Sequence, residues 1–104
     1  MRDRLNSEIC SVYLRALADP DRLRIIQALA EGPQPVGEIS RRLRVPMANI
    51  SHHLKHLRNA GLVSTRKKGR FVYYAVSKKV LDRNAKLPLN VLDFGCCRVE
   101  LGSK

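Results

Sequence analysis

A mainly α-helical domain that carries one small β-hairpin is the fold class that this sequence predicts. Three observations lead to it: apolar residues recur at helical spacing through the first half of the chain, a later stretch alternates around a glycine, and no repeat or Pro/Gly/Ser-rich linker divides the 104 residues. Helices show apolar residues three and four apart, whereas strands show them at every second position. With 44% hydrophobic residues, the chain is expected to form one domain, residues 1–104, with a core of modest size.

The N-terminal part of the chain predicts two helices. Over about residues 5–18, an amphipathic stripe is formed by Leu5, Ile9, Tyr13 and Leu17. The second helix begins where Asp19 stands at the N-cap position and Pro20 at the first helical position, and Gly32-Pro33 ends it. Its expected buried stripe consists of Leu23, Ile26 and Leu29.

Residues 36–60 predict two further helices with a short joint between them. "VGEISRRL" is followed by "RVP" and then by "MANISHHLKHLRNA", which Gly61 ends. The residues of the longer helix expected to face the core are Met47, Ile50, Leu54 and Leu57. Its other side carries the small or hydrogen-bonding residues Ala48, Asn49, Ser51, His52 and Lys55. Two short helices across a tight turn, the second apolar behind and polar in front, are typical of a helix-turn-helix.

Residues 62–77, "LVSTRKKGRFVYYAVS", predict two strands joined at Lys68-Gly69, where glycine gives the backbone freedom that a tight hairpin needs. In this pattern Val63 and Thr65 are the alternating positions of the first strand, and they are matched with Phe71, Tyr73 and Ala75 of the second. The loop is strongly basic and contains Arg66, Lys67, Lys68 and Arg70. A basic hairpin directly after a recognition helix is the wing of a winged helix-turn-helix. In residues 78–104, one or two helical turns and then an extended tail or short strand with Cys96 and Cys97 are expected.

The net charge of +11 lies in one contiguous block. Residues 39–81 hold 11 Lys or Arg and no Asp or Glu, while the rest of the chain holds nine of each sign. A solvated face normally mixes both signs, so this distribution favours a polyanionic partner. The block is not a single basic amphipathic helix, and no run approaches the roughly 18 apolar residues of a membrane span, so a membrane partner is not expected.

Other classes of protein have little support. The chain has no Gly-rich phosphate loop, no paired carboxylates in an apolar setting and no arrangement of catalytic Ser, His and Asp, so an enzyme is not expected. The N-terminus lacks the apolar stretch of a signal peptide, and three cysteines are too few for a disulfide framework. These features predict a cytoplasmic protein with reduced thiols.

Three segments together resemble the ArsR/SmtB family of bacterial winged-helix repressors. They are "LADPDRLRIIQAL", "ISHHLKHLRNAGLV" and "KKGRFVYYAVS", and the similarity covers roughly residues 12–77. The resemblance implies a homodimer that uses its first helix, over residues 5–18, and usually its last segment as the interface. It also implies operator DNA as the partner, and repression that is relieved when an effector binds.

The residues expected at DNA follow from the predicted motif, with the helix-turn-helix over 36–60 and the wing over 62–77. Arg41, Arg42 and Arg44, at the end of the first short helix and in the turn, suit phosphate contacts. Base edges are expected to meet Asn49, Ser51 and His52, and backbone phosphates to meet Lys55, Arg66, Lys67, Lys68 and Arg70. For His53, a hydrogen-bonding role inside the motif is favoured over base reading.

Two effector sites known in the family are absent from this sequence. Where the resemblance places a Cys-x-Cys pattern, the chain has Pro35 and Gly37. Past residue 77 it has Asp82, Asp93 and Glu100 but no His, which argues against a zinc, nickel or cobalt sensor that uses a C-terminal helix. His52 and His56 are four residues apart and can share a metal, but a DNA-facing role is simpler.

The remaining candidates are Cys96, Cys97 and Cys10. Thiolates select soft, thiophilic ions, and neighbouring cysteines can direct two sulfurs to the pyramidal centre of trivalent arsenic or antimony, with Cys10 as a third ligand. Some family members bind arsenite through a neighbouring Cys pair in the C-terminal tail, so arsenite or methylarsenite is the preferred effector; mercury also suits a pair.

Three alternatives remain open at this point. The thiols can sense redox state or persulfide, with Arg98 favouring the thiolate, and oxidation would more readily link Cys10 to the tail than join adjacent cysteines. The cysteines can simply pack as small apolar residues, which leaves a regulator without an effector. The chain can also be an architectural DNA-binding protein without sequence specificity, which the ratio of operator to random-DNA affinity would reveal.

Overall fold

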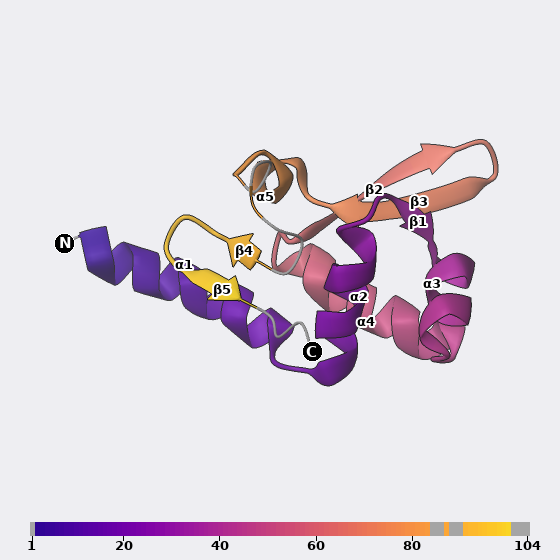
Figure 1. The fold of residues 1–104 in the computed structure, drawn as a ribbon, viewed down its shortest axis with the longest axis horizontal. Coiled ribbons are helices and arrows are strands. Elements are labelled where there is room, and N and C mark those ends of the chain that lie inside the picture. The colour runs from indigo at the N-terminus through magenta and orange to yellow at the C-terminus, as the bar shows by residue number, and fades with distance from the viewer. Residues whose placement is uncertain (1, 84–86, 88–90, 101–104) are drawn as a thin grey trace.

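The computed structural model describes residues 2–83, 87 and 91–100, with the side chains of 2–6, 82 and 83 left aside (Figure 1). Its helices are α1 (Arg2–Leu17), α2 (Pro20–Leu29), α3 (Val36–Leu43), α4 (Met47–Asn59) and α5 (Lys78–Arg83). Its strands are β1 (Gln34–Pro35), β2 (Val63–Lys68), β3 (Phe71–Val76), β4 (Val91–Asp93) and β5 (Arg98–Glu100). The predicted winged helix-turn-helix fold is confirmed. Every helix in these described ranges is too short or too polar to serve as a membrane span.

The core lies where α2, α3 and α4 meet the sheet. Its residues with no exposed surface are Ile25, Ile39, Ile50, Leu54 and Leu57. Ile50, Leu54 and Leu57 follow the helical period along one side of α4, so this side is fixed against the domain. The opposite side of α4 is therefore turned to solvent.

The joint between α3 and α4 is short and well fixed. Arg44 closes α3 in the left-handed region, with φ at 59°, and the Val45 backbone N–H donates to the Ser40 carbonyl. The Ser40 hydroxyl in turn donates to the Val45 carbonyl at 2.6 Å. The three-residue joint is confirmed, but the expected inward placement of Met47 is wrong. Met47 is the first residue of α4 and is 55% exposed, because the joint projects that end of the helix past the core.

The wing is a hairpin of β2 and β3, and β1 extends it to an antiparallel sheet in the order β1-β3-β2. The register pairs Val63 with Val76 and Lys68 with Phe71, and Gly69 turns the chain with φ at 65°. The expected matching of Val63 and Thr65 with Phe71, Tyr73 and Ala75 is therefore wrong, because Val63 pairs with Val76 and Thr65 with Tyr74. Val76, the last residue of β3, is buried in the core, while Phe71 near the tip is 55% exposed. Strand β1 was not predicted from the sequence.

Two contacts position the C-terminal part of the chain. The short helix expected in this part of the chain is α5. The segment expected to be extended forms a hairpin of β4 and β5, which lies along α1 (Figure 1). Leu92 and Phe94 are buried in the main core, and the Phe94 ring lies 5.0 Å from the Tyr13 ring of α1. Away from these contacts, α1 leaves the apolar residues Ile9, Val12 and Leu14 exposed by 44–51%.

The start of α2 confirms the predicted cap. Asp19 adopts extended backbone angles, and its carboxylate accepts hydrogen bonds from the backbone N–H groups of Asp21 at 2.8 Å and Arg22 at 3.2 Å. Partial burial alone raises the pKa of this carboxyl. The N–H groups of Arg22 and Asp21, with the charges of His53 and Arg22, nevertheless hold that pKa below its ordinary value of 3.8.

Replacement of the cap gives a first test. Asp19→Ala is expected to raise the equilibrium constant of unfolding severalfold, because two N–H groups lose their acceptor. The pKa of Asp19 is lower in the folded state than in the unfolded state, where it is about 4, so the ionised carboxylate stabilises the fold above about pH 4. This stabilisation is lost as the pH falls through the folded-state pKa. Urea unfolding should therefore show a gap between wild type and Asp19→Ala at neutral pH that narrows below about pH 4.

The matched control is Asp19→Asn, which keeps the capping oxygen and should retain most of the stability. Equal unfolding free energies for Asp19→Ala and wild type at neutral pH would contradict the role of this cap.

Candidate DNA-binding surface and thiol cluster

The solvent side of α4 carries the residues predicted to read bases. Asn49, Ser51 and His52 are all exposed, as is Lys55 one turn further along the helix. They lie opposite the buried Ile50 side, so they form one polar strip. A helix with such a strip fits the major groove, where amide, hydroxyl and imidazole groups can bond base edges.

Three arginines lie in the last turn of α3 and at its C-terminal end. Arg41 pairs with Glu38 at 3.0 Å, and Arg42 forms an ion pair with Glu31. Arg44 is exposed in the left-handed turn. Exposed ion pairs are weak, so a DNA phosphate can replace these carboxylates at small cost.

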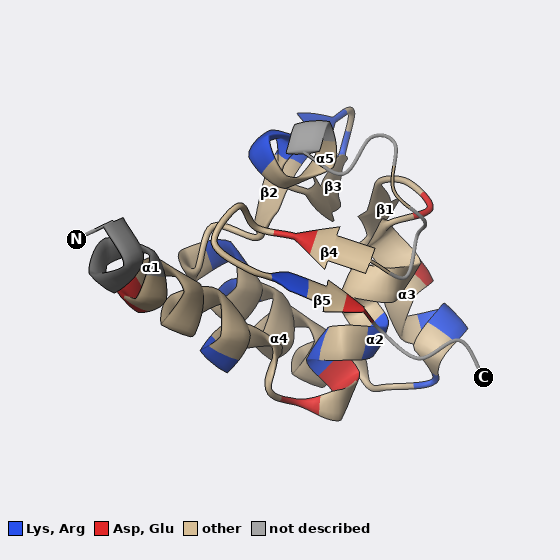
Figure 2. Cartoon of the chain, turned by 60° about the vertical axis from the view of Figure 1, so that its left-hand side comes forward, with Lys and Arg blue, Asp and Glu red and all other residues tan. Residues whose placement is uncertain are grey.

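The wing carries four exposed cations, Arg66, Lys67, Lys68 and Arg70. Figure 2 shows Lys and Arg on this hairpin and on α3. Cations on a protruding hairpin can reach phosphates beyond those near the recognition helix, which adds affinity without base specificity.

His53 lies behind the exposed polar strip of α4. Its side chain is only 13% exposed, with Nε2 3.9 Å from Asp19 and 3.8 Å from Asp21, and Nδ1 3.4 Å from an Arg22 nitrogen. These contacts join α4 to the capped start of α2 and favour the structural role over base reading. Asp19, Asp21 and His53 also have metal-ligand chemistry. The Asp19 carboxylate already accepts two backbone hydrogen bonds, however, and the Arg22 guanidinium lies beside His53.

His52 and His56 approach each other on the exposed side of α4, with 3.3 Å between their Nε2 atoms. Burial and the positive charges of His52, Arg22, His53 and Lys55 lower the pKa of His56 from its ordinary value of 6.5. The electrostatic effect indicates a positive potential on this part of α4, as a DNA-facing surface requires.

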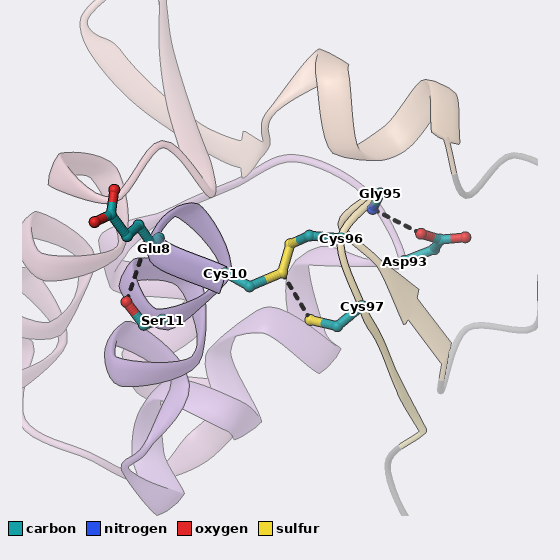
Figure 3. Close-up of a disulfide and its surroundings, with 7 residues drawn as sticks. All are labelled: Glu8, Cys10, Ser11, Asp93, Gly95, Cys96 and Cys97. Carbon is teal, nitrogen blue, oxygen red and sulfur yellow. Dashed lines mark hydrogen bonds between the residues drawn. A yellow bond between two sulfur atoms is a disulfide. The ribbon is translucent and has the colours of Figure 1, made fainter. Parts of the chain in front are cut away.

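The three cysteines meet between α1 and the C-terminal hairpin (Figure 3). Cys10 is 6% exposed on the core side of α1, while Cys96 and Cys97 are half-buried in the turn between β4 and β5. Cys10 and Cys96 form a disulfide whose Cα atoms are 6.0 Å apart, and the Cys97 sulfur lies 3.1 Å from the Cys10 sulfur. All three sulfurs are within 4.8 Å of one another.

The turn of this hairpin directs both neighbouring cysteines toward α1. Gly95 has φ at 91°, and its N–H donates to the Asp93 carboxylate at 2.8 Å, while the Phe94 N–H donates to the Cys97 carbonyl. Phe94, packed on Tyr13, attaches the turn to the helix. This aromatic pair was not predicted from the sequence, because nothing in the two local patterns indicates a contact across 81 positions.

The donor set of the thiol cluster fits a soft, three-coordinate ion. Once the Cys10–Cys96 bond is reduced, three thiolates are available from one chain, as a pyramidal centre such as trivalent arsenic requires. A structural zinc site normally has four ligands, and the described residues place no fourth Cys, His or carboxylate in this cluster. The same three sulfurs can also undergo reversible oxidation.

Comparisons with known proteins identify the family of this chain. The family described as bacterial regulatory proteins of the arsR family matches residues 19–65. The transcriptional repressor SdpR of Bacillus subtilis is 33% identical over 78% of this chain and 90% of its own length.

Two solved structures are similar in fold. One is the homodimeric winged helix-turn-helix DNA-binding domain of Mb0332 from Mycobacterium bovis, with 28% identity, a TM-score of 0.70 and coverage of 79% of this chain and 76% of that one. The other, described as a possible transcriptional regulator for arsenical resistance, has 38% identity, a TM-score of 0.61 and coverage of 71% and 77%. The named relatives are regulators rather than enzymes.

Thiol reactivity tests the packing around the cluster. In reduced protein, a bulky thiol reagent should modify Cys96 and Cys97 faster than Cys10, because Cys10 is only 6% exposed. Phe94→Ala should accelerate modification of Cys10 severalfold, since the ring attaches the hairpin to α1. Phe71→Ala, on the distant wing, is the control and should leave the rates unchanged. Peptide mass spectrometry assigns the sites; equal rates for all three wild-type cysteines would contradict this packing.

Proposed function

The chain belongs to the ArsR/SmtB family of bacterial winged-helix transcriptional regulators, and on that premise we propose that it is a repressor released from operator DNA by trivalent arsenic. The observation that carries this proposal is the convergence of Cys10, Cys96 and Cys97 within 4.8 Å. Arsenite is the preferred effector, since it can use three sulfurs; methylarsenite would use two. A DNA-binding repressor of this kind acts in the bacterial cytoplasm, where thiols are kept reduced.

On the DNA side, Asn49, Ser51 and His52 read base edges in the major groove. The contacts to phosphates come from Arg41, Arg42, Arg44, Lys55, Arg66, Lys67, Lys68 and Arg70. The exposure of the α4 strip and of the wing supports these roles. One such domain makes few contacts, so high affinity requires two copies on two half-sites.

The second copy docks through α1. Ile9, Val12 and Leu14 are exposed apolar residues on this helix, and apolar side chains at that density on one element are typical of an interface. A symmetric homodimer buries the same face of both copies and places two recognition helices on one side of the DNA. The homodimeric state of Mb0332 supports this arrangement.

The thiol cluster communicates with DNA through α1. Cys10 lies on the core side of this helix and its neighbour Ile9 on the exposed side, so a ligand that fixes the hairpin to Cys10 acts on the element that sets the dimer geometry. A change in that geometry alters the spacing of the two recognition helices. A coupling of about 1–3 kcal/mol would weaken operator binding roughly 5–150-fold.

A second candidate function has one specific observation in its favour. The Cys10–Cys96 disulfide is the oxidised product that a redox-responsive repressor would form. Its formation from two thiols releases two protons and two electrons to an oxidant such as a peroxide or polysulfide. Oxidation and arsenite act on the same sulfurs. Under reducing conditions the disulfide does not form, so the effect of arsenite on DNA binding is then measured alone.

Operator release by arsenite tests the main proposal. Reduced protein bound to labelled DNA from upstream of its own gene should lose affinity roughly 5–150-fold when arsenite is added. The Cys96→Ser/Cys97→Ser double variant should bind DNA as wild type does but ignore arsenite, and Cys10→Ser should respond weakly. Fluorescence anisotropy measures each affinity, and Ser7→Ala, on an exposed position of α1, is a neutral control.

The remaining outcomes separate the alternatives. If arsenite leaves the affinity for operator DNA unchanged, while peroxide abolishes DNA binding and a thiol reductant restores it, the protein senses redox state rather than arsenic. Loss of DNA binding in the reduced double variant without any effector would make the cysteines structural. Equal affinity for operator and random DNA would indicate an architectural protein.

A further inference from the structure

A groove of about 520 Å³ opens between the helix-turn-helix and the wing. It lies between the start of α3, the start of α4 and the β3 strand. The residues of its wall that matter here are Val36, Glu38, Arg41, Met47, Arg70 and Phe71. Neither the effector site nor the predicted base-reading strip includes this groove.

Met47, which was wrongly predicted to face the core, and Phe71 of the wing both line this groove. Met47 and Phe71 are each 55% exposed, and neighbouring Val72 is 42% exposed. Exposed apolar side chains that cluster on a concave surface mark a binding site more often than scattered ones do. Their exposure is explained if a partner covers them in the functional complex.

The charges around these residues indicate the kind of partner. Arg41 and Arg70 contribute two exposed guanidinium groups to the same wall, and the carboxylate beside them, Glu38, is already paired with Arg41 at 3.0 Å. The partner must therefore present negative charge and apolar surface together. A DNA strand does so, because phosphates alternate with deoxyribose rings and thymine carries a methyl group in the major groove.

We propose that one strand of the bound DNA runs through this groove, with sugar or thymine-methyl carbons against Met47 and Phe71 and phosphates held by Arg41 and Arg70. The inference rests on the proposed DNA-binding function and adds an apolar contact surface to it. Met47 stands at the N-terminus of the recognition helix, the end that normally enters the major groove. Phe71 follows the basic wing tip directly, so both ends of the groove adjoin surfaces assigned to DNA.

Salt dependence distinguishes apolar from ionic contacts in this groove. Removal of an apolar contact lowers the affinity at every salt concentration and leaves the slope of log K against log salt unchanged, whereas removal of a phosphate contact reduces that slope by about one. Phe71→Ala and Met47→Ala should each weaken binding about three- to thirtyfold with an unchanged slope. Arg70→Gln should weaken binding and reduce the slope.

The experiment uses the full-length, reduced protein and a duplex that the wild type has selected from random-sequence DNA. Phe71→Leu and Met47→Leu are the matched variants; they keep apolar volume and should restore most of the affinity. Ser64→Ala, an exposed wing position that does not line the groove, should bind as wild type does. Circular dichroism melting identifies any variant that fails to fold, and for such a variant the salt slope of Arg70→Gln and the remaining alanine variant carry the test.

The outcomes separate this inference from the proposed function. A wild-type protein that selects no duplex contradicts the proposed function itself. A wild type that selects a duplex, with Phe71→Ala and Met47→Ala binding it equally well, overturns the groove proposal and leaves the groove to a ligand other than DNA. Weaker binding by both alanine variants with a reduced salt slope would also overturn it, because the interactions of these side chains with DNA would then depend on phosphate charge.

Discussion

Burial of one side of α4 is the constraint on which the rest of the structure depends. Ile50, Leu54 and Leu57 have no exposed surface, so the rotation of the helix about its axis is fixed by the core. That rotation turns the strip from Asn49 to Lys55 outward and places His53 against the capped start of α2. Met47, the first residue of α4, extends past the core and lines the groove beside the wing. The packing of this one helix thus positions the recognition strip and the groove that we assign to DNA.

The C-terminal hairpin adds a second, more local dependence. Phe94 and Leu92 are buried in the main core, and the turn between β4 and β5 holds two cysteines against a third on α1. The hairpin strands are only three residues long, so this contact with α1 must supply much of their stability. Chemistry at the sulfurs therefore acts directly on α1, the helix through which we propose that the second copy docks.

Local patterns in the sequence predicted much of the fold and less of the candidate site. The Asp19-Pro20 cap, the bounds of α3 and the three-residue joint depend on neighbouring residues, and each is confirmed. Met47 was wrongly placed because periodicity records where apolar residues recur but not where the core ends. The partners of Val63 and Thr65 were wrongly assigned because alternation does not fix the register of a hairpin. The approach of Cys10 to Cys97, 87 positions away, depends on how the tail folds back, which no local pattern encodes. For the same reason β1 was missed, since two residues carry no strand pattern of their own.

The number of sulfur atoms around bound arsenic tests the central claim most directly. X-ray absorption at the arsenic edge, on reduced full-length protein with one equivalent of arsenite, reports the ligands without any assumption about DNA. We expect three sulfur ligands in the wild type and two in Cys10→Ser, because Cys10, Cys96 and Cys97 converge within one chain. Two sulfurs in the wild type, unchanged by Cys10→Ser, would show that α1 takes no part in the site and would contradict the proposed route to the DNA-binding surface.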